Sequence, residues 1–267
     1  MDILQNRRTT IASYPGGKSD VKKHLPLYRN IPKKNIVVEP FAGLANFSII
    51  TSPISSKIYL NDRDPYIYSL LKIITEKELL QKLITEIRNL EYVEREDYYE
   101  WKGKTSKDPV EMAMKQLVIL NCSVNAAGGG YSKDKAHRQW YRRKEKVWLK
   151  IHDILTSRDV EVFNMNYTSF LDSLTLDDQT LVYLDPPYFE VAKSGNLYGN
   201  GFNSIDASEL SKRLDGLNCH WIMSNRYSPE TEEMFSGYFT LKYNTYNDMN
   251  NRRGANPELL VSNYQLI

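Results

Sequence analysis

The sequence predicts an α/β fold, a doubly wound sheet that is interrupted by a helical insertion. Apolar, β-favouring runs end in polar groups at Asp62, Asn166 and Asp185, and helical patterns lie between them. Such runs are typical of parallel strands that are buried on both faces. Because open α/β sheets bind ligands beyond the carboxyl ends of their strands, these polar groups mark a candidate site.

Length and composition set the limits of this prediction. The 267 residues suffice for one large domain, or for one domain with an insertion. Net charge is only +2, so a basic surface for nucleic acid must be local. The two cysteines predict neither a disulfide framework nor a zinc site, which suits the cytoplasm. We see no signal peptide and no membrane span, and we expect no metal.

Residues 181–184 form the clearest predicted strand, and Asp185, Pro186, Pro187 and Tyr188 follow it directly. A proline cannot donate to a sheet ladder, so the strand ends there and the turn is stiff. The turn holds a carboxylate, carbonyl oxygens and an aromatic ring in fixed relation. This set suits a planar base that carries an amino group. The alternative is an ordinary strand end with a rigid loop.

Residues 14–19 read Tyr-Pro-Gly-Gly-Lys-Ser and lie near the N-terminus. A phosphate-binding loop is excluded, because Ala12 stands where that loop needs its first glycine. The two glycines permit a tight turn and a close approach of the backbone to a ligand. A plain loop before a helix over residues 19–28 is the alternative interpretation.

Residues 35–48 predict a strand, a tight turn and a helix, the first unit of a nucleotide-binding half. A second strand, residues 57–61, ends at Asp62. The spacing from Gly43 is about 20 residues, where such folds place a carboxylate that binds ribose hydroxyls. Asp64 would cap the next helix, although Asp62 could itself be a simple cap.

The tetrapeptide at 185–188 resembles the Asp-Pro-Pro-Tyr signature of amino-methyltransferases, which methylate exocyclic nitrogens of DNA bases. The motif order, with aromatic-x-Gly-Gly-Lys first and the tetrapeptide late, most resembles the Dam-like (D12 class, alpha group) DNA adenine-N6 methyltransferase family. The resemblance covers both ends of the chain and is weak in the middle. It implies a Rossmann-like methyltransferase sheet that binds S-adenosylmethionine through Tyr14, Gly17, Lys18, Glu39, Phe41, Ala42, Gly43, Asp62, Asn166, Tyr167 and Asp185.

Two segments depart from the family pattern. Ala45 stands where the family has a glycine, and alanine still lets the backbone come close. Asn166 and Tyr167 stand where the family has Asp-Phe, whose carboxylate binds the amino group of the cofactor adenine. An asparagine can accept that hydrogen bond through its side-chain oxygen, and tyrosine keeps the aromatic face.

The middle of the chain reads as helical. Apolar residues recur at helical spacing over residues 67–90 and 109–123, with Lys and Glu on the other face of the first segment. No strand–helix alternation is visible between about residue 71 and residue 155. We therefore expect a catalytic domain of residues 1–70 and 155–267. Residues 71–154 would form a helical insertion, where the family carries its target-recognition domain.

Basic and aromatic residues gather at the end of this insertion, after three glycines at 128–130. Cations can neutralise phosphates while aromatic rings stack on bases, although a basic surface helix is the alternative. The loop at 189–202 is a candidate lid or DNA-contacting segment. The nucleic-acid contacts that we expect are Asn125, Tyr131, Lys135, Arg138, Tyr141, Arg142, Arg143, Lys193 and Tyr198.

The resemblance implies a site-specific transfer of a methyl group from S-adenosylmethionine to N6 of an adenine flipped out of double-stranded DNA. Asp185 and the Pro186 carbonyl would accept the amino N–H groups, Pro187 would stiffen the turn, and Tyr188 would stack on the base. An RNA adenine-N6 methyltransferase, a protein-glutamine methyltransferase and an inactive DNA-binding homologue are the alternatives. We expect a monomer in solution, away from membranes, with a cognate restriction enzyme as one candidate partner.

Overall fold

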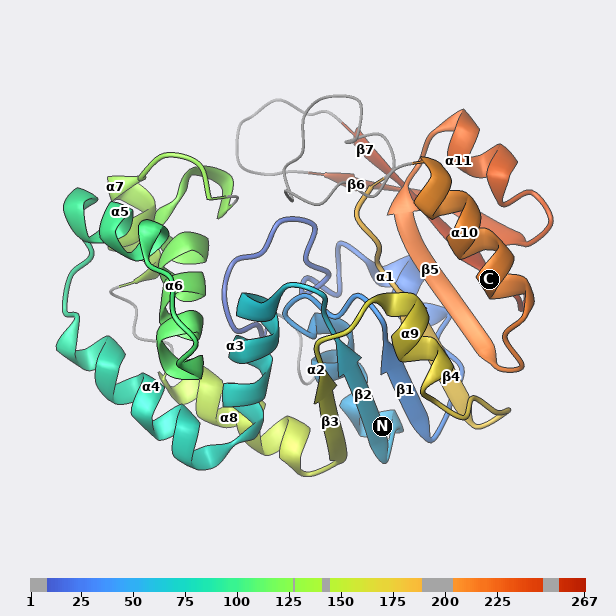
Figure 1. Cartoon of the computed structure of the whole chain (residues 1–267). Coiled ribbons are helices and arrows are strands. Elements are labelled where there is room, and N and C mark those ends of the chain that lie inside the picture. The colour runs from blue at the N-terminus through green and yellow to red at the C-terminus, as the bar shows by residue number, and fades with distance from the viewer. Residues whose placement is uncertain (1–8, 127, 141–144, 189–203, 247–254) are drawn as a thin grey trace.

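One seven-stranded sheet forms the centre of the protein (Figure 1). The computed structural model describes residues 9–126, 128–140, 145–188, 204–246 and 255–267. The strands are β1 (Ile36–Glu39), β2 (Lys57–Asn61), β3 (Asp159–Phe163), β4 (Thr180–Leu184), β5 (His220–Arg226), β6 (Phe239–Tyr246) and β7 (Ala255–Ser262).

The strand order is β3-β2-β1-β4-β5-β7-β6. The first five strands in the chain pair in parallel, and β7 runs antiparallel between β5 and β6. The order of the strands reverses between β1 and β4, and this switch point is where open α/β sheets bind their ligands. The α/β sheet that the sequence predicts is confirmed.

Helices surround the sheet and also form a lobe at one side of it (Figure 1). They are α1 (Leu25–Arg29), α2 (Asn46–Thr51), α3 (Pro65–Thr75), α4 (Lys77–Asn89), α5 (Arg95–Gly103), α6 (Pro109–Cys122), α7 (Lys133–Gln139), α8 (Glu145–Thr156), α9 (Tyr167–Asp172), α10 (Ser204–Asp215) and α11 (Pro229–Met234), with short 3-10 turns at Ser52–Ile54 and Val124–Ala126. None of the described helices combines the length and the apolarity that crossing a membrane demands.

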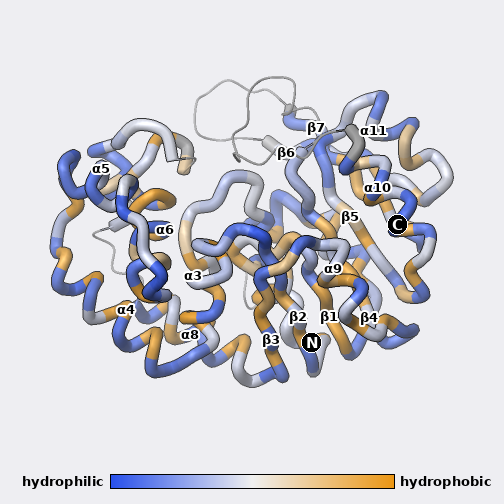
Figure 2. The backbone as a smooth tube through the Cα atoms, viewed as in Figure 1, coloured by the Kyte–Doolittle hydropathy of each residue, from blue (hydrophilic) through white to orange (hydrophobic). Residues whose placement is uncertain are grey.

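Alternate residues of each central strand enter different cores, as the pleat requires. Leu181 and Tyr183 of β4 pack with α1 and α2, whereas Val182 and Leu184 pack with α9 and α10. Figure 2 shows the central strands β1 and β4 as mostly hydrophobic and the surrounding helices as mixed. Burial on both faces explains why β4 reads as one continuous apolar run.

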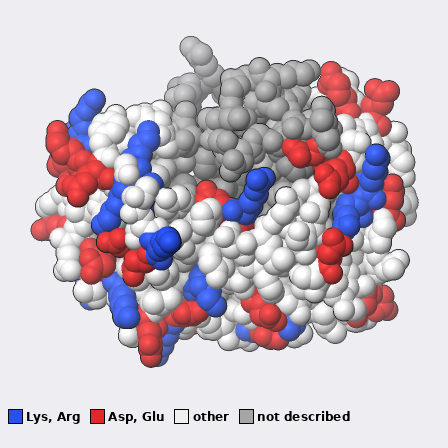
Figure 3. Space-filling view, viewed as in Figure 1, with Lys and Arg blue, Asp and Glu red and all other residues white. Residues whose placement is uncertain are grey.

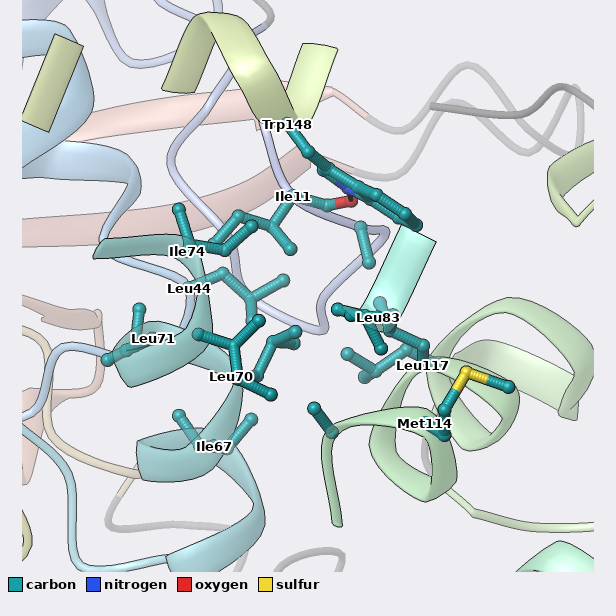
Figure 4. Close-up of a cluster of buried hydrophobic side chains, with 14 of the residues drawn as sticks. Ile11, Leu44, Ile67, Leu70, Leu71, Ile74, Leu83, Met114, Leu117 and Trp148 are labelled. Atoms are coloured by element: carbon teal, nitrogen blue, oxygen red, sulfur yellow. Dashed lines mark hydrogen bonds between the residues drawn. The ribbon is translucent and has the colours of Figure 1, made fainter. Parts of the chain in front are cut away.

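The helical lobe α3–α8 shares one hydrophobic core with the sheet (Figure 4). Leu70 and Ile74 of α3 lie in this core between the sheet and the outer helices. Trp148 of α8 is buried there, and its Nε1 donates to the Ile11 carbonyl at 2.8 Å. Because the core is continuous, the division of the chain at residues 71 and 154 stays a prediction.

Two helix predictions are wrong. Residues 19–28 do not form one helix, because only Leu25–Arg29 is helical. Pro26 explains this, since proline lacks an N–H and fits only the first turn of a helix. The segment 67–90 is two helices, separated at Glu76 by extended backbone with φ −114° and ψ 109°. The break turns both apolar faces into the same core, whereas one straight helix of this length would extend about 36 Å.

Candidate active site

The carboxyl ends of β1, β2 and β4 lie at one edge of the sheet, and the loop before α1 runs across that edge (Figure 1). The edge carries the Glu39, Asp62 and Asp185 carboxyl groups, and the loop adds Tyr14 and Lys18. The polar ends of the predicted strands therefore do meet, as the sequence predicts. Their contacts divide the site into a region around Asp185 and a region around Asp62.

Asp185 is held by a buried lysine. Lys18 Nζ lies 3.1 Å from Asp185 Oδ1 and 3.2 Å from Oδ2, and it also donates to the Gly16 carbonyl at 3.0 Å. The Lys18 side chain is only 2% exposed, against 22% for Asp185. Burial alone would lower the pKa of Lys18, but the Asp185 and Glu258 carboxylates outweigh it and hold the pKa above its ordinary value. Lys18 is therefore a permanent cation behind an accessible carboxylate.

A chain of hydroxyl groups supports Asp185 from the neighbouring strand. Ser224 Oγ of β5 donates to Asp185 Oδ1 at 3.0 Å, and its own oxygen lies 2.8 Å from the Tyr183 hydroxyl. β4 and β5 are paired so that Leu184 lies opposite Met223, which brings Ser224 level with Asp185. The orientation of the Asp185 carboxylate is thus fixed from two sides.

The residues after Asp185 form a rigid turn over the same region. Pro186 is buried, while Pro187 and Tyr188 are half-buried. The Tyr188 hydroxyl donates to Glu258 Oε1 at 3.0 Å, and Lys18 Nζ lies 5.7 Å from the centre of the ring. The four residues predicted as catalytic are therefore together, with the Tyr188 ring held at its far end.

Asp62 fixes the glycine turn after β1. Its Oδ2 accepts from the Gly43 amide at 2.9 Å, and its Oδ1 accepts from the Asp64 amide at 2.9 Å. Burial raises the pKa of Asp62 to about 6. The N-cap of α3 is Asp64, whose side chain accepts from the Tyr66 amide at 2.8 Å. The alternative interpretation, that Asp62 caps this helix, is therefore wrong.

Backbone geometry explains the residue types in this turn. Gly43 has φ +51°, and a Cβ atom there would lie 3.0 Å from the Tyr14 ring. Ala45 also adopts the left-handed conformation, with φ 52°, at a cost of roughly 1–2 kcal/mol for a residue with a Cβ. The departure from glycine at Ala45 is therefore accommodated under strain, in a turn that packs against Tyr14.

Glu39 lies deeper than Asp62. It is 2% exposed, and its Oε1 accepts from the Ser48 amide at 2.9 Å in the first turn of α2. Burial raises the pKa of Glu39 to about 8, so the group carries a proton at neutral pH. In this structure Glu39 stabilises the start of α2, and contact with a cofactor stays a prediction.

The site fits a ligand with a cationic amino group and a ribose. An ionised carboxylate has about four lone-pair positions, and Asp62 uses two of them for backbone amides. Asn46 offers a second acceptor, since its buried Oδ1 has no hydrogen-bond partner among the described residues. A Cβ atom on Gly17 would lie 3.1 Å from Asn46 Nδ2, so the Asn46 side-chain amide lies beside the turn at Gly17.

The predicted adenine contacts lie at the end of β3. The rings of Phe41 and Tyr167 are 5.0 Å apart, and the two residues pack into the same core. Asn166 is exposed and is the N-cap of α9, and its Oδ1 accepts from the Thr168 amide at 3.0 Å. Ala42 donates its amide to the Asn61 carbonyl at 2.8 Å, which ties the glycine turn to β2.

Only part of the predicted nucleic-acid surface is described. The Tyr131 hydroxyl donates to the Val93 carbonyl at 2.8 Å, and Lys135 Nζ donates to the Leu120 carbonyl at 2.9 Å. These contacts give both residues structural roles within the lobe. Arg138 is 67% exposed and lies 3.9 Å from Asp134, and basic and acidic side chains are interspersed over the visible face of the lobe (Figure 3). The Asn125 side chain, Tyr141, Arg142, Arg143, Lys193, Tyr198 and the proposed lid at 189–202 lie outside the described residues.

Three polar residues of the site have no role in the sequence prediction: Asn46, Ser224 and Glu258. Ser224 and Glu258 reach Asp185 and Tyr188 through strand pairings far apart in the chain. Asn46 follows the glycine turn directly, and this position could have indicated a ligand contact.

The sheet order and the polar edge define a Rossmann-like α/β sheet with a candidate ligand site at its switch point. The sequence model of the D12 class N6 adenine-specific DNA methyltransferase family matches residues 14–249. The chain belongs to this family, and it is an N6 adenine-specific DNA methyltransferase whose substrate is DNA. The family implies S-adenosylmethionine as the methyl donor. Membership therefore decides against the RNA and protein substrates considered from the sequence.

Individual relatives are distant. The chain is 24% identical over 217 residues to the DNA adenine methylase of Escherichia coli (strain K12), covering 76% of this chain and 74% of that protein. The DNA adenine methylase of Escherichia coli O157:H7 matches with the same figures. The crystal structure of precorrin-6y C5,15-methyltransferase from Geobacter metallireducens is 10% identical and covers 96% of this chain and 95% of that chain. Its TM-score against this chain is 0.45.

Proposed function

We propose that the protein methylates N6 of an adenine flipped out of double-stranded DNA, at a specific site, with Asp185, Pro186, Pro187 and Tyr188 around the reacting amino group. The observation that carries this proposal is the geometry of Asp185. Its carboxylate lies at the ligand edge of the sheet, is oriented by Lys18 and Ser224, and remains 22% exposed.

The chemistry requires acceptors that are aimed at an amino group. The N6 lone pair of adenine is delocalised into the ring, so the amino group is a poor nucleophile. Hydrogen bonds from its two N–H groups to Asp185 and to the Pro186 carbonyl would localise the lone pair on nitrogen. When bound, S-adenosylmethionine supplies a methyl group on a sulfonium. The protein contributes orientation and electrostatic stabilisation.

A base inside a duplex cannot reach this edge, so it must leave the stack. Tyr188 supports this step, because its ring is half-buried and its hydroxyl is fixed on Glu258. A ring held in this way can stack on an extruded adenine without first being ordered. We propose that the Asp62 carboxylate accepts hydrogen bonds from the ribose hydroxyls of the cofactor. The Asn46 amide oxygen would accept from its amino group.

We propose that the protein acts in the cytoplasm. Cys122 and Cys219 are free and buried, which suits the cytoplasm, where thiols stay reduced. A monomeric state in solution and a cognate restriction enzyme stay predictions.

Methyl transfer in vitro tests the proposal. The protein is incubated with S-adenosylmethionine labelled in the methyl group and with duplex DNA, single-stranded DNA or RNA. We expect label in duplex DNA, recovered as N6-methyladenine after digestion to nucleosides, and none with the Asp185→Ala variant. Label that favours single strands, or that is recovered in cytosine, would contradict the proposal.

A further inference from the structure

Glu258 is a buried carboxyl group that contacts two residues of the site. It lies on β7, the strand inserted between β5 and β6, and its side chain is 9% exposed. Its Oε1 accepts from the Tyr188 hydroxyl at 3.0 Å. Its Oε2 lies 4.0 Å from Lys18 Nζ and has no hydrogen-bond partner among the described residues. Leaving a buried acceptor without a partner is unfavourable, so this oxygen needs an explanation.

Asp185 is in the opposite situation, because three of its roughly four lone-pair positions are already in use. Lys18 contacts both of its oxygens, and Ser224 donates to one of them. An ammonium ion that bridges both oxygens withdraws electron density from the acceptor that the adenine amino group needs. Charge-assisted hydrogen bonds to carboxylates are roughly twice as strong as neutral ones, so an amino group competes poorly with Lys18.

We propose that Glu258 is a positioning residue that receives the Lys18 ammonium group when the target adenine enters, which frees Asp185 to accept from the adenine amino group. The inference rests on the proposed function, in which Asp185 is the acceptor. Glu258 would control whether Asp185 is available to the adenine amino group. Closing the 4.0 Å gap to a charge-assisted bond of about 2.8 Å moves Nζ by roughly 1 Å. Lys18 stays protonated and buried throughout, and before the shift its Nζ also donates to the Gly16 carbonyl at 3.0 Å.

The arrangement also couples base stacking to the movement of Lys18. Glu258 Oε1 holds Tyr188, which would stack on the base, while Oε2 faces Lys18. One carboxylate therefore contacts both the stacking ring and the cation that competes for Asp185. This explains why a second carboxylate is buried so close to Asp185.

The Glu258→Gln variant tests the inference. Glutamine keeps the size of the side chain and an acceptor for Tyr188, but it has no negative charge for Lys18. We expect single-turnover methyl transfer to slow by roughly 10- to 100-fold, as the loss of a charge-assisted hydrogen bond implies. Affinity for S-adenosylhomocysteine should not change. The control is Glu232→Gln on α11, because Glu232 also accepts from a tyrosine hydroxyl, that of Tyr227 at 3.2 Å, but is exposed.

A binding measurement separates positioning from a merely structural role. Duplexes carry either adenine or purine, which lacks the amino group, at the target position mapped for the wild-type enzyme. The wild type should bind adenine about tenfold more tightly than purine, and Glu258→Gln should reduce this ratio toward one.

An unchanged ratio or an unchanged transfer rate in Glu258→Gln would overturn the inference. A parallel loss of thermal stability and of all affinities, with the ratio retained, would overturn it too, as would a wild-type ratio of one. If the wild type does not methylate adenine at all, the proposed function fails instead.

Discussion

Asp62→Asn should weaken the binding of S-adenosylhomocysteine by roughly 10- to 100-fold. The Asp62 carboxylate already accepts from the Gly43 and Asp64 amides, so the lone pairs that remain would hold the ribose hydroxyls. An asparagine keeps one acceptor oxygen and loses the charge. Hydrogen bonds to charged groups contribute about 1.5–3 kcal/mol, and each 1.4 kcal/mol is tenfold in affinity.

The pH dependence of cofactor binding provides a second test of the role of Asp62. Burial raises the pKa of Asp62 to about 6, so the carboxylate loses its charge as the pH falls through this value. Wild-type affinity should then fall, by up to about tenfold per pH unit below the pKa. Folding responds in the opposite direction, because a raised carboxyl pKa means that the folded state binds this proton more tightly. The contribution of Asp62 to the free energy of unfolding therefore increases as the pH is lowered from 7 to 5.

Calorimetric titration with S-adenosylhomocysteine between pH 5 and pH 8 is the assay. The control is Asp64→Asn, because Asp64 is the exposed neighbour that caps α3. Asp64→Asn should bind nearly as the wild type does. The reasoning is refuted if Asp62→Asn binds with wild-type affinity, or if its affinity still falls as the pH is lowered through 6.

Three further changes have definite expected results. Asp185→Ala should slow methyl transfer by ~10²-fold or more, since an aimed acceptor is lost, while DNA and cofactor binding persist at least in part; single-turnover kinetics and binding assays check this. Replacing Arg138, Arg142 and Arg143 with Ala should reduce the slope of log K against log salt by about 2 to 3, because each lost phosphate contact removes about 0.9; a wild-type slope would mean a solvated surface. Trp148→Phe should destabilise the fold by about 2 kcal/mol in urea denaturation, because a buried carbonyl loses its donor, and an unchanged midpoint would contradict this.

The sheet was predictable because its strands are buried on both faces. β4 is buried at every position, so it reads as a continuous apolar run that ends at Asp185. The fixed geometry of the prolines then identified the turn. The same local logic failed for α1, because Pro26 lacks an N–H and confines the helix to Leu25–Arg29. It also failed at Glu76, because an apolar stripe does not show where a helix bends toward a shared core.

The polar contacts of the site depend on pairings that are remote in sequence. Lys18 and Asp185 are 167 positions apart, and Tyr188 and Glu258 are 70 apart. The inserted strand β7 brings Glu258 to the edge, and no periodicity in the sequence reveals that insertion. A lysine is usually exposed, so the burial of Lys18 could not be read from its residue type.

The most direct test of the central claim is expression of the chain in a host that lacks adenine methylation, followed by genome-wide mapping of modified bases. The account predicts N6-methyladenine at one recurring short sequence, and far less of it when the Asp185→Ala variant is expressed to the same level. An unmodified genome with the folded wild-type protein would contradict the proposed function, and methylation at the wild-type level in the variant would contradict the role assigned to Asp185.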